Sequence, residues 1–224
     1  MSDNFDFIIN FASKRKTMGK IKMLGALAGD IIGSVYEFCN TKSTDFDLFC
    51  GASNFTDDSV MTLAVAKWLL EDSSHTIHYL IYCLQELGDH HPNAGYGGRF
   101  AGWLCEDNPQ PYNSWGNGAG MRVSPVGLYA QTLDEALALA AVTASVSHNH
   151  PEGVKGAQAI ATSVFSASKG SRNKKSRIIS RGRLATIYIV LLQRFALDTD
   201  LMFHVKEACQ RPSLPFWKAT RLRR

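Results

Sequence analysis

The sequence predicts an all-α protein, and three observations support this fold class. Apolar residues recur with helical spacing in several stretches between residues 59 and 168. Helix-start signals precede two of these stretches, because Glu135 follows Thr132 by three residues and Pro151 opens the last stretch. Strand signals are weak before residue 185. At 224 residues, the chain is long enough for one sizeable core or two small domains.

The first expected element is the small, apolar stretch 23–38, MLGALAGDIIGSVYEF. Gly25, Gly29 and Gly33 recur in it at every fourth residue, so they share one helix face. Because this face carries no side chains, we expect it to pack closely against a neighbour. A polar loop then leads to the next apolar run.

Helical periodicity predicts the next two elements. We expect helices over residues 59–71 and 75–87. Ser73 and Ser74 precede the second helix and are typical of helix caps.

The second half of the chain combines glycine-rich loops with helices. Residues 93–104 and 113–130 are each typical of a glycine-rich loop that leads into a short helix. The capping box at Thr132 predicts a helix that continues to residue 146. Pro151 predicts a helix over 151–168.

The composition is that of a soluble globular protein, with 45% hydrophobic and 20% charged residues. No apolar stretch approaches the roughly 20 residues that a membrane span requires. The N-terminal segment does not match a secretory signal, because its apolar residues precede its basic ones. The five cysteines are scattered and lack metal-ligand spacing. We therefore expect reduced thiols and a cytoplasmic location.

The net charge of +4 conceals two segments of opposite sign. Residues 1–167 carry 10 Lys and Arg against 17 Asp and Glu, whereas residues 168–224 carry 14 against 3. This step suggests a basic tail that binds nucleic acid, or a segment that was never selected as part of this protein. The tail ends in RPSLPFWKATRLRR, which is not a lysine-rich or amphipathic basic helix, so we do not expect nucleic acid as a partner.

The stretch FTDDS places Thr56, Asp57 and Asp58 directly before an apolar run. A helix N-terminus needs only one capping oxygen, so several side-chain oxygens are left over. Three oxygen donors from one turn suit Mg²⁺, which prefers hard ligands. An Asp-rich helix N-terminus without a metal accounts for the same residues, and spacing alone favours this second interpretation.

The stretch NSWGNGAGMR, residues 113–122, places small residues ahead of a helix. Gly116 and Gly118 allow backbone N–H groups to converge on an anion, and the helix dipole favours negative charge there. Asn117 can add a hydrogen bond, and Arg122 can pair with a phosphate or with a structural carboxylate. A plain glycine-rich turn is the alternative, and the pattern alone favours it.

Two histidines and one acidic residue are further candidates. His148 and His150 lie in a polar loop before Pro151, which suggests contact with a ligand or a metal, although zinc would need a third imidazole or a thiolate. Solvent-facing loop histidines are the alternative. Glu37 closes an apolar helix, where a carboxylate either faces solvent or acts beside a metal as a general base or ligand.

Five motifs in this order resemble the ADP-ribosylglycohydrolase family. They are GDIIGSVYE, FTDDSVMTLAVA, GYGGRFAGW, SWGNGAGMRVSPVG and SHNHPEGVKGAQAIA, which cover about residues 23–167. The family is all-helical, carries two Mg²⁺ ions in a cleft and hydrolyses the glycosidic bond between ADP-ribose and a protein side chain or small acceptor. The resemblance therefore implies a compact helical fold, Mg²⁺ as cofactor, and an ADP-ribosylated protein or small ADP-ribosyl compound as substrate.

The resemblance also implies roles for individual residues. Thr56, Asp57 and Asp58 match the N-terminal half of the dinuclear metal site. Glu37 matches an acidic residue that some branches use in catalysis. The substrate-binding set matches the loop around the diphosphate and ribose and a substrate-contacting histidine: Ser114, Trp115, Gly116, Asn117, Gly118, Met121, Arg122 and His148.

The second half of the family's metal site is a motif of the type G-G-D-[ST]-D-T, which this chain lacks. We take the similar letters in ALDTDLMF, residues 196–203, as a coincidence. We hypothesise that residues from about 170 onward come largely from frameshifted DNA. Codons for residues 183–197, read two nucleotides later, permit the family-like text IGYDLHRTIAEIR, and the frameshift would also explain the basic charge.

These observations predict three segments. Residues 1–22 form a disordered N-terminal extension, residues 23–169 a partial family-like helical domain that is incomplete at its C-terminus, and residues 170–224 an aberrant basic tail. The expected function is Mg²⁺-dependent hydrolysis of ADP-ribosyl linkages, impaired because half of the anionic ligands are missing. The alternative is a catalytically inactive ADP-ribose-binding protein. The acceptor and the oligomeric state are not readable from the sequence.

Overall fold

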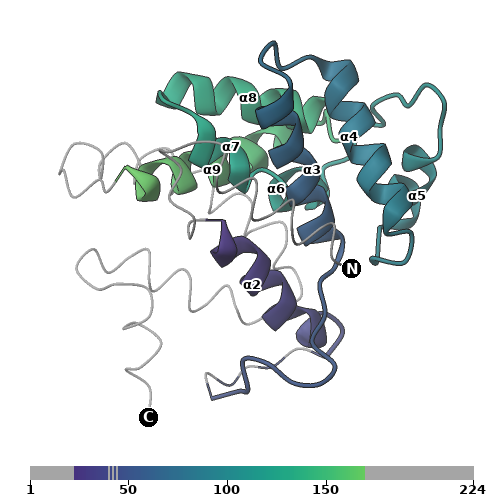
Figure 1. Ribbon diagram of the computed structural model, residues 1–224, viewed down its shortest axis with the longest axis vertical. Helices are drawn as coiled ribbons and strands as arrows, with labels where there is room; N and C mark the ends of the chain where they lie inside the picture. The colour runs from purple at the N-terminus through teal and green to yellow at the C-terminus, as the bar shows by residue number, and fades with distance from the viewer. Residues whose placement is uncertain (1–22, 40, 42, 44, 170–224) are drawn as a thin grey trace.

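The computed structural model describes residues 23–39, 41, 43 and 45–169 (Figure 1). These residues form helices and no strand, so the predicted all-α fold is confirmed for them. In chain order the elements are α2 (Leu24–Gly33), the 3-10 helix η1 (Ser34–Tyr36), α3 (Asp57–Glu71), α4 (Ile77–His90), α5 (Gly98–Leu104), α6 (Gly118–Met121), α7 (Ser124–Tyr129), α8 (Leu133–Ser145) and α9 (Pro151–Ser168). The expectations for residues 1–22 and 170–224 lie outside the described residues.

Helix α3 passes through the core, and α9 is the common packing partner of α6, α7 and α8 (Figure 1). The consecutive residues 59–62 of α3 are all buried, so this helix is covered on every side in its first turns. Trp68 of α3 and Trp103 of α5 are among the largest fully buried side chains. Within the described residues, none of the helices is long and apolar enough to span a bilayer.

The helix starts at Thr132 and Pro151 are confirmed. The Thr132 hydroxyl accepts the N–H of Glu135 at 3.1 Å, and the Glu135 carboxylate accepts the N–H of Gln131 at 2.7 Å. Pro151 is the first residue of α9. Local side-chain chemistry was therefore sufficient to place both helix starts.

Helix α4 starts at Ile77, two residues later than we expected, and continues to His90. The carboxylate of Asp72 accepts the backbone N–H groups of Ser74 at 2.9 Å and Thr76 at 2.6 Å. The backbone of His75 has a φ of 50°, which an α-helix does not allow. The prediction that Ser73 and Ser74 cap this helix is wrong, because the Asp72 side chain extends the turn to Thr76.

The glycine face of α2 does not pack as we expected. A Cβ placed on Gly25, Gly29 or Gly33 would meet no atom of the described residues within 4 Å. Helix α2 instead contacts α3 near its own start, where Met23 packs with Ala66 in a small apolar cluster. The spacing of the three glycines therefore has no explanation in the described packing.

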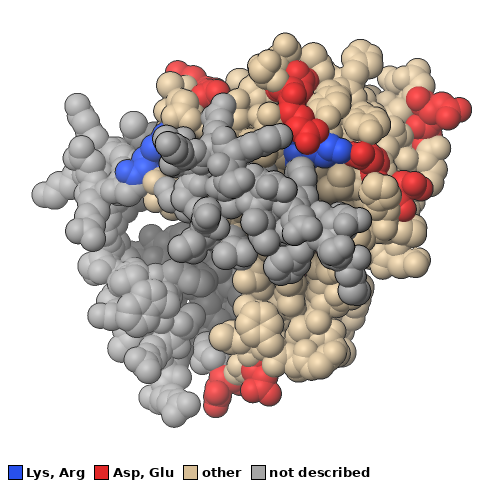
Figure 2. Space-filling model, in the orientation of Figure 1, with Lys and Arg blue, Asp and Glu red and all other residues tan. Residues whose placement is uncertain are grey.

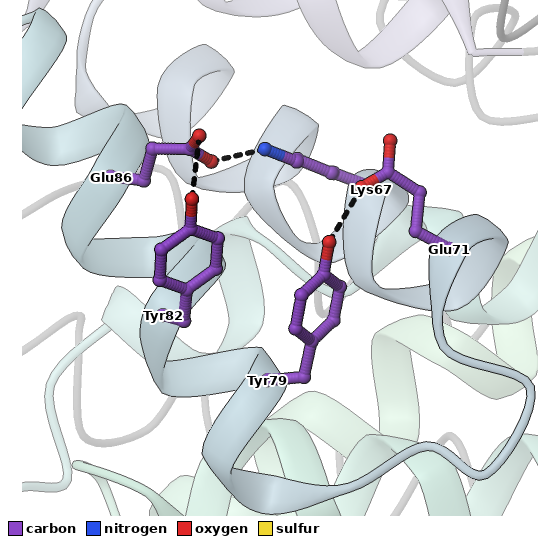
Figure 3. A network of polar contacts seen from close by, with 5 residues as sticks. All are labelled: Lys67, Glu71, Tyr79, Tyr82 and Glu86. Carbon is purple, nitrogen blue, oxygen red and sulfur yellow. Dashed lines mark hydrogen bonds and ion pairs between the residues drawn. The ribbon is translucent and has the colours of Figure 1, made fainter.

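Polar side chains join α3 to α4 at the surface (Figure 3). Lys67 forms an ion pair with Glu86, and Tyr82 donates a hydrogen bond to the same carboxylate at 3.1 Å. Beside them, Tyr79 donates to Glu71 at 2.7 Å, and its ring stacks on that of Tyr82. Burial opposes both charges, but their mutual hydrogen bond raises the pKa of Lys67 and lowers that of Glu86. The pair therefore stabilises the contact between the two helices.

We expect a double-mutant cycle of Lys67→Met and Glu86→Gln to give a coupling energy of about 0.5–1 kcal/mol, measured by urea unfolding. The side chains are 16% and 24% exposed, so solvent screens them only in part. Lys155 and Glu152 on α9 form a matched control, because the Lys155 side chain is 55% exposed. A coupling for Lys67 and Glu86 no larger than that of the control would contradict this expectation.

Candidate functional site

Four carboxylates come together where α3 begins beside α2 and η1. We call Asp30, Glu37, Asp57 and Asp58 the acidic cluster. Burial, together with the charges of Asp58, Glu37 and Asp30, raises the pKa of Asp57 to about 7. Burial also raises the pKa of Asp58 to about 6, with the charges of Asp30 and Glu37 contributing. The cluster is therefore a concentration of mutually repelling negative charge. On the face drawn in Figure 2, the described surface carries several separate groups of Asp and Glu and few Lys or Arg.

Asp30 differs from the other three carboxylates because it is fully hydrogen-bonded. It accepts the backbone N–H of Thr56 at 2.8 Å and of Ser59 at 3.2 Å. It also accepts the hydroxyls of Thr56 at 2.6 Å and Ser59 at 2.5 Å. A side chain from α2 thus satisfies unpaired N–H groups at the start of α3 and fixes the direction of its first turn. Sequence analysis missed Asp30, although an acidic residue within an apolar helix is itself a signal for a polar partner.

The structure separates the roles within FTDDS. The Thr56 hydroxyl is the N-cap of α3 and accepts the N–H of Asp58 at 3.3 Å. The Asp57 and Asp58 carboxylates are partly buried, and the hydrogen bond that lowers the pKa of each comes from its own backbone N–H. The capping interpretation therefore explains Thr56 and does not account for the carboxylates of Asp57 and Asp58.

The carboxylates of Asp57 and Asp58 fit a divalent cation. Burial and neighbouring carboxylates raise the pKa of each, and a cation between them would neutralise the repulsion among these charges. No group of three or more His, Cys, Asp or Glu side chains in the described part of the chain is arranged to hold a metal. The fit therefore rests on Asp57 and Asp58, with the Thr56 hydroxyl beside them.

The glycine-rich loop 113–118 uses part of its hydrogen-bonding capacity internally. The Ser114 hydroxyl accepts the N–H of Gly116 at 3.2 Å, so this N–H is not free for an anion as we expected. Asn113 has a φ of 54°, and its N–H donates to the side chain of Asn149 at 2.7 Å. Helix α6 has only four residues, so the helix dipole that we expected at Gly118 is weak.

His148 lies directly against this loop. A Cβ at Gly118 would lie 2.6 Å from Nε2 of His148, so only glycine allows the ring to come this close. The ring is 5% exposed and lies near the rings of Phe100 and Tyr112, with centroids 6.1 Å and 5.5 Å away. Burial, assisted by the charge of Arg122, lowers the pKa of His148 to about 3. His148 is therefore neutral at physiological pH.

The other two candidates in this region, His150 and Trp115, occupy different positions. His150 is the N-cap of α9, where its Nδ1 accepts the N–H of Glu152 at 3.1 Å. Trp115 is 52% exposed, and its ring lies 6.5 Å from that of His150. Both histidines therefore lie beside the glycine-rich loop, His148 at Gly118 and His150 at Trp115.

Arg122 lies inside the described fold and not at the surface of the loop. It is fully buried, and its Nη2 donates to the carbonyl of Thr143 at 2.5 Å and to the hydroxyl of Ser147 at 2.8 Å. Its role in the described residues is to link α6 to the end of α8. Met121 is half-buried, and its carbonyl accepts the hydroxyl of Thr62 at 3.2 Å.

The acidic cluster and the loop are connected through α3 and α5. Thr62, which binds Met121 of α6, follows Asp58 by about one helical turn. On the other side, the charge of Asp57 acts on Tyr96, whose ring lies 6.1 Å from that of Phe100. Phe100 in turn contacts His148. The structure thus brings the FTDDS, SWGNG and SHNHP motifs into one region.

The comparison with known families now decides the classification. The family model described as ADP-ribosylglycohydrolase matches residues 20–213. The chain belongs to the ADP-ribosylglycohydrolase family. This confirms the resemblance and the expected helical fold, and it indicates ADP-ribosyl glycohydrolase activity in general terms. No curated protein matches the chain at a significant level.

The match between the chain and the family model extends beyond residue 169. It therefore includes much of the segment 170–224, for which we hypothesise a frameshifted origin. That origin stays a hypothesis, and the nucleotide sequence of the source DNA from codon 160 onward would test it.

We expect the protein to lose stability through His148 as the pH falls below 6.5. The pKa of His148 falls from 6.5 to about 3 on folding, so between these values the unfolded chain binds a proton that the folded chain does not. The free energy of unfolding then decreases by up to about 1.4 kcal/mol for each pH unit. Urea unfolding at several pH values, compared with His148→Gln, measures this difference.

The comparison with His148→Gln is needed because Asp57 and Asp58 act in the opposite direction. Their pKa values are raised on folding, so acid protonates them first in the folded chain. His78→Gln is the matched control, because His78 is exposed. Equal pH slopes for wild type and His148→Gln would show that His148 is not held neutral.

Proposed function

We propose that the protein binds an ADP-ribosyl group between the acidic cluster and the loop 113–118, and that it hydrolyses the glycosidic bond with Mg²⁺. The pair Asp57 and Asp58 is the observation that carries this proposal. Two adjacent, partly buried carboxylates repel each other when both are ionised, and a bound cation would relieve this repulsion. The resemblance to the family, whose model the chain matches, also implies a divalent cation at these residues.

The residues of the acidic cluster would have different roles in the proposed site. Asp57 and Asp58, with the Thr56 hydroxyl, would hold the metal, and Asp30 keeps the first turn of α3 in position through its hydrogen bonds. When bound, Mg²⁺ supplies Lewis-acid polarisation of the ribose and the leaving atom and orients a water. Glu37 is exposed at the end of η1, close enough to raise the pKa of both aspartates, and we assign it the role of general base.

The loop side of the site would hold the diphosphate and ribose. Gly118 and Asn117 lie where His148 reaches the loop, and the neutral ring of His148 has an Nε2 edge that faces Gly118. The exposed ring of Trp115 offers an apolar surface beside the loop. Ser114 shapes the loop through its bond to Gly116. These contacts support binding of an ADP-ribosyl group without involving Arg122.

We further propose that the protein binds Mg²⁺ only weakly when no ADP-ribose is bound. Mg²⁺ in proteins is commonly held by one or two carboxylates, several waters and oxygens of the substrate. Asp57 and Asp58 provide two carboxylates, so the oxygens of ADP-ribose would complete the coordination. Mg²⁺ and ADP-ribose are then expected to strengthen each other's binding by the same factor.

A specific observation supports the alternative of an inactive ADP-ribose-binding protein. The loop 113–118 and His148 are in direct contact, whereas no three His, Cys, Asp or Glu side chains of the described residues are arranged to hold a metal. Binding through the loop and His148 would not require a metal. The two candidate functions therefore differ in their dependence on Mg²⁺.

Calorimetric titration of the full chain with ADP-ribose, in EDTA and then in excess MgCl₂, tests both functions. Tighter binding with Mg²⁺, together with release of ADP-ribose from ADP-ribosylated arginine, serine or small-molecule substrates, supports the hydrolase. Equal binding in both buffers without turnover supports the inactive binder. Absence of ADP-ribose binding in both buffers would overturn both. Asp107→Asn removes a charge at an exposed acidic residue of the loop after α5. It is the control for a general effect of negative charge on Mg²⁺ binding.

The location of the protein is also a proposal. The four described cysteines, Cys39, Cys50, Cys83 and Cys105, are free thiols. Free thiols are typical of a reducing compartment, so we propose a cytoplasmic location. Labelling of the thiols in intact cells with a maleimide that crosses membranes, against one that does not, would test it.

A further inference from the structure

We infer that Arg122 and Ser147 are positioning residues that fix His148 as a neutral imidazole with its proton on Nε2, directed at the glycine-rich loop. This inference deepens the proposed function, because it concerns the hydrogen bond that His148 offers to an ADP-ribosyl ligand. The resemblance to the family implied a substrate-binding role for Arg122 and no role for Ser147, so neither residue was expected to position His148.

The three side chains form a continuous relay. Nη2 of Arg122 lies 2.8 Å from the Ser147 hydroxyl, and that hydroxyl lies 2.8 Å from Nδ1 of His148. The second hydrogen on Nη2 is used by the carbonyl of Thr143 at 2.5 Å. Nε and Nη1 of Arg122 find no acceptor in the structure, so Nη2 makes all of the hydrogen bonds of this guanidinium to the described residues.

Hydrogen accounting sets the direction of the relay. A guanidinium only donates, so the Ser147 oxygen accepts from Arg122. The remaining hydrogen of the Ser147 hydroxyl has Nδ1 of His148 as its partner, and it can only be donated if Nδ1 carries no proton. The opposite direction would leave the hydroxyl hydrogen of Ser147 buried without an acceptor, which costs the full desolvation of that group. The proton of the neutral ring is therefore on Nε2.

The geometry turns this proton toward the ligand side. Nε2 and Cε1 of His148 are the ring atoms nearest to Gly118, at 2.6 Å and 2.7 Å from the position of a Cβ there. No described residue accepts a hydrogen bond from Nε2, so this donor is available to an oxygen of a ligand at the loop. Burial and the nearby positive charge of Arg122 lower the pKa of His148 to about 3, so the ring stays neutral. The donor is therefore independent of pH across the physiological range.

Two variants of equal size at Ser147 test the direction of the relay. In Ser147→Asn, the amide oxygen can accept from Arg122 and the amide NH₂ can donate to Nδ1, so the direction is kept. In Ser147→Asp, the carboxylate only accepts, so Nδ1 must carry a proton. Both variants add similar volume, so a difference between them reports polarity and not packing.

The experiment is ¹⁵N-histidine NMR of the full chain, which reports the protonation of each ring nitrogen. The His148 signals are assigned by their loss in His148→Gln. We expect the Nε2–H form in the wild type and in Ser147→Asn, and a proton on Nδ1 in Ser147→Asp. Calorimetry should then show ADP-ribose binding at least about tenfold weaker in Ser147→Asp than in Ser147→Asn, the effect of one lost hydrogen bond to a charged ligand.

The outcomes separate this inference from the proposed function. A wild-type ring with its proton on Nδ1, or the same ring form in both variants, overturns the relay, and the wild-type measurement stands even if the variants do not fold. Absence of ADP-ribose binding in a wild type with the Nε2–H form overturns the proposed function and leaves the relay supported. Equal ADP-ribose binding by the two variants, with different ring forms, overturns the role of the Nε2 proton in binding.

Discussion

Replacement of Asp57 or Asp58 by asparagine is expected to stabilise the metal-free protein and to abolish its response to Mg²⁺. Each carboxylate is partly buried beside a second negative charge, and burial raises the pKa of Asp57 to about 7 and that of Asp58 to about 6. Removing one charge at pH 8 should therefore increase the free energy of unfolding by about 1–2 kcal/mol, a value limited by solvent screening.

The pH dependence of this gain gives it a distinctive signature. A carboxylate whose pKa is raised on folding costs more stability as the pH rises from its unfolded pKa of 3.8 to its folded pKa of about 7, and the cost is complete above that. The gain in Asp57→Asn should therefore be present at pH 8 and shrink as the pH falls from about 7 towards 4. Thermal unfolding with and without MgCl₂ measures both effects, because a cation that binds only the folded chain raises its stability.

Two controls make the interpretation specific. Asp107→Asn removes a charge at an exposed position and should change neither the stability nor the response to Mg²⁺. Mg²⁺ stabilisation that persists unchanged in both Asp57→Asn and Asp58→Asn would show that the cation binds elsewhere. A loss of stability at pH 8 in both variants would show that the two carboxylates are paired with positive groups and do not repel each other.

Gly127→Ala is expected to be among the most destabilising single substitutions in the described domain. A Cβ at this position would lie 2.5 Å from the backbone oxygen of Ala161, 2.7 Å from Cβ of Val164 and 2.9 Å from the backbone nitrogen of Phe165. Because two of these atoms belong to the backbone of α9, no side-chain rotation relieves the overlap. We expect a loss of about 3 kcal/mol or more, since α7 and α9 would have to separate.

Gly102→Ala provides the matched control for this effect. Gly102 lies in α5, and a Cβ there would meet no atom within 4 Å among the described residues. Alanine is the better helix former, so this variant should be neutral or stabilising by up to about 1 kcal/mol. Chemical unfolding of both variants measures the difference. Similar stabilities for Gly127→Ala and Gly102→Ala would show that α7 and α9 are not in close contact.

The sequence was most informative where structure depends on near neighbours along the chain. The capping box at Thr132 and the proline at Pro151 predicted two helix starts, because their hydrogen bonds and dihedral limits act within one turn. The start of α4 was misplaced because the side chain of Asp72 competes with the helix for the N–H groups that follow it.

The family was also readable from the sequence, since the order and composition of five motifs identified it. The motif letters do not reveal what each side chain contacts. Arg122 and Ser147 show this: a conspicuous arginine proved to be buried, and an inconspicuous serine bridges it to His148. Burial depends on residues far apart in the chain, which no local pattern reports.

The sequence by itself determined the all-α class, most helix starts and the residue types available for chemistry, because helices form through contacts within a few residues. Only the tertiary structure decided that Asp30 of α2 holds the first turn of α3, and that Gly118 admits the ring of His148. It also decided that Asp57 and Asp58 are partly buried beside the carboxylates of Asp30 and Glu37. These properties arise from desolvation and from contacts between elements separated in the chain, and folding alone brings such elements together.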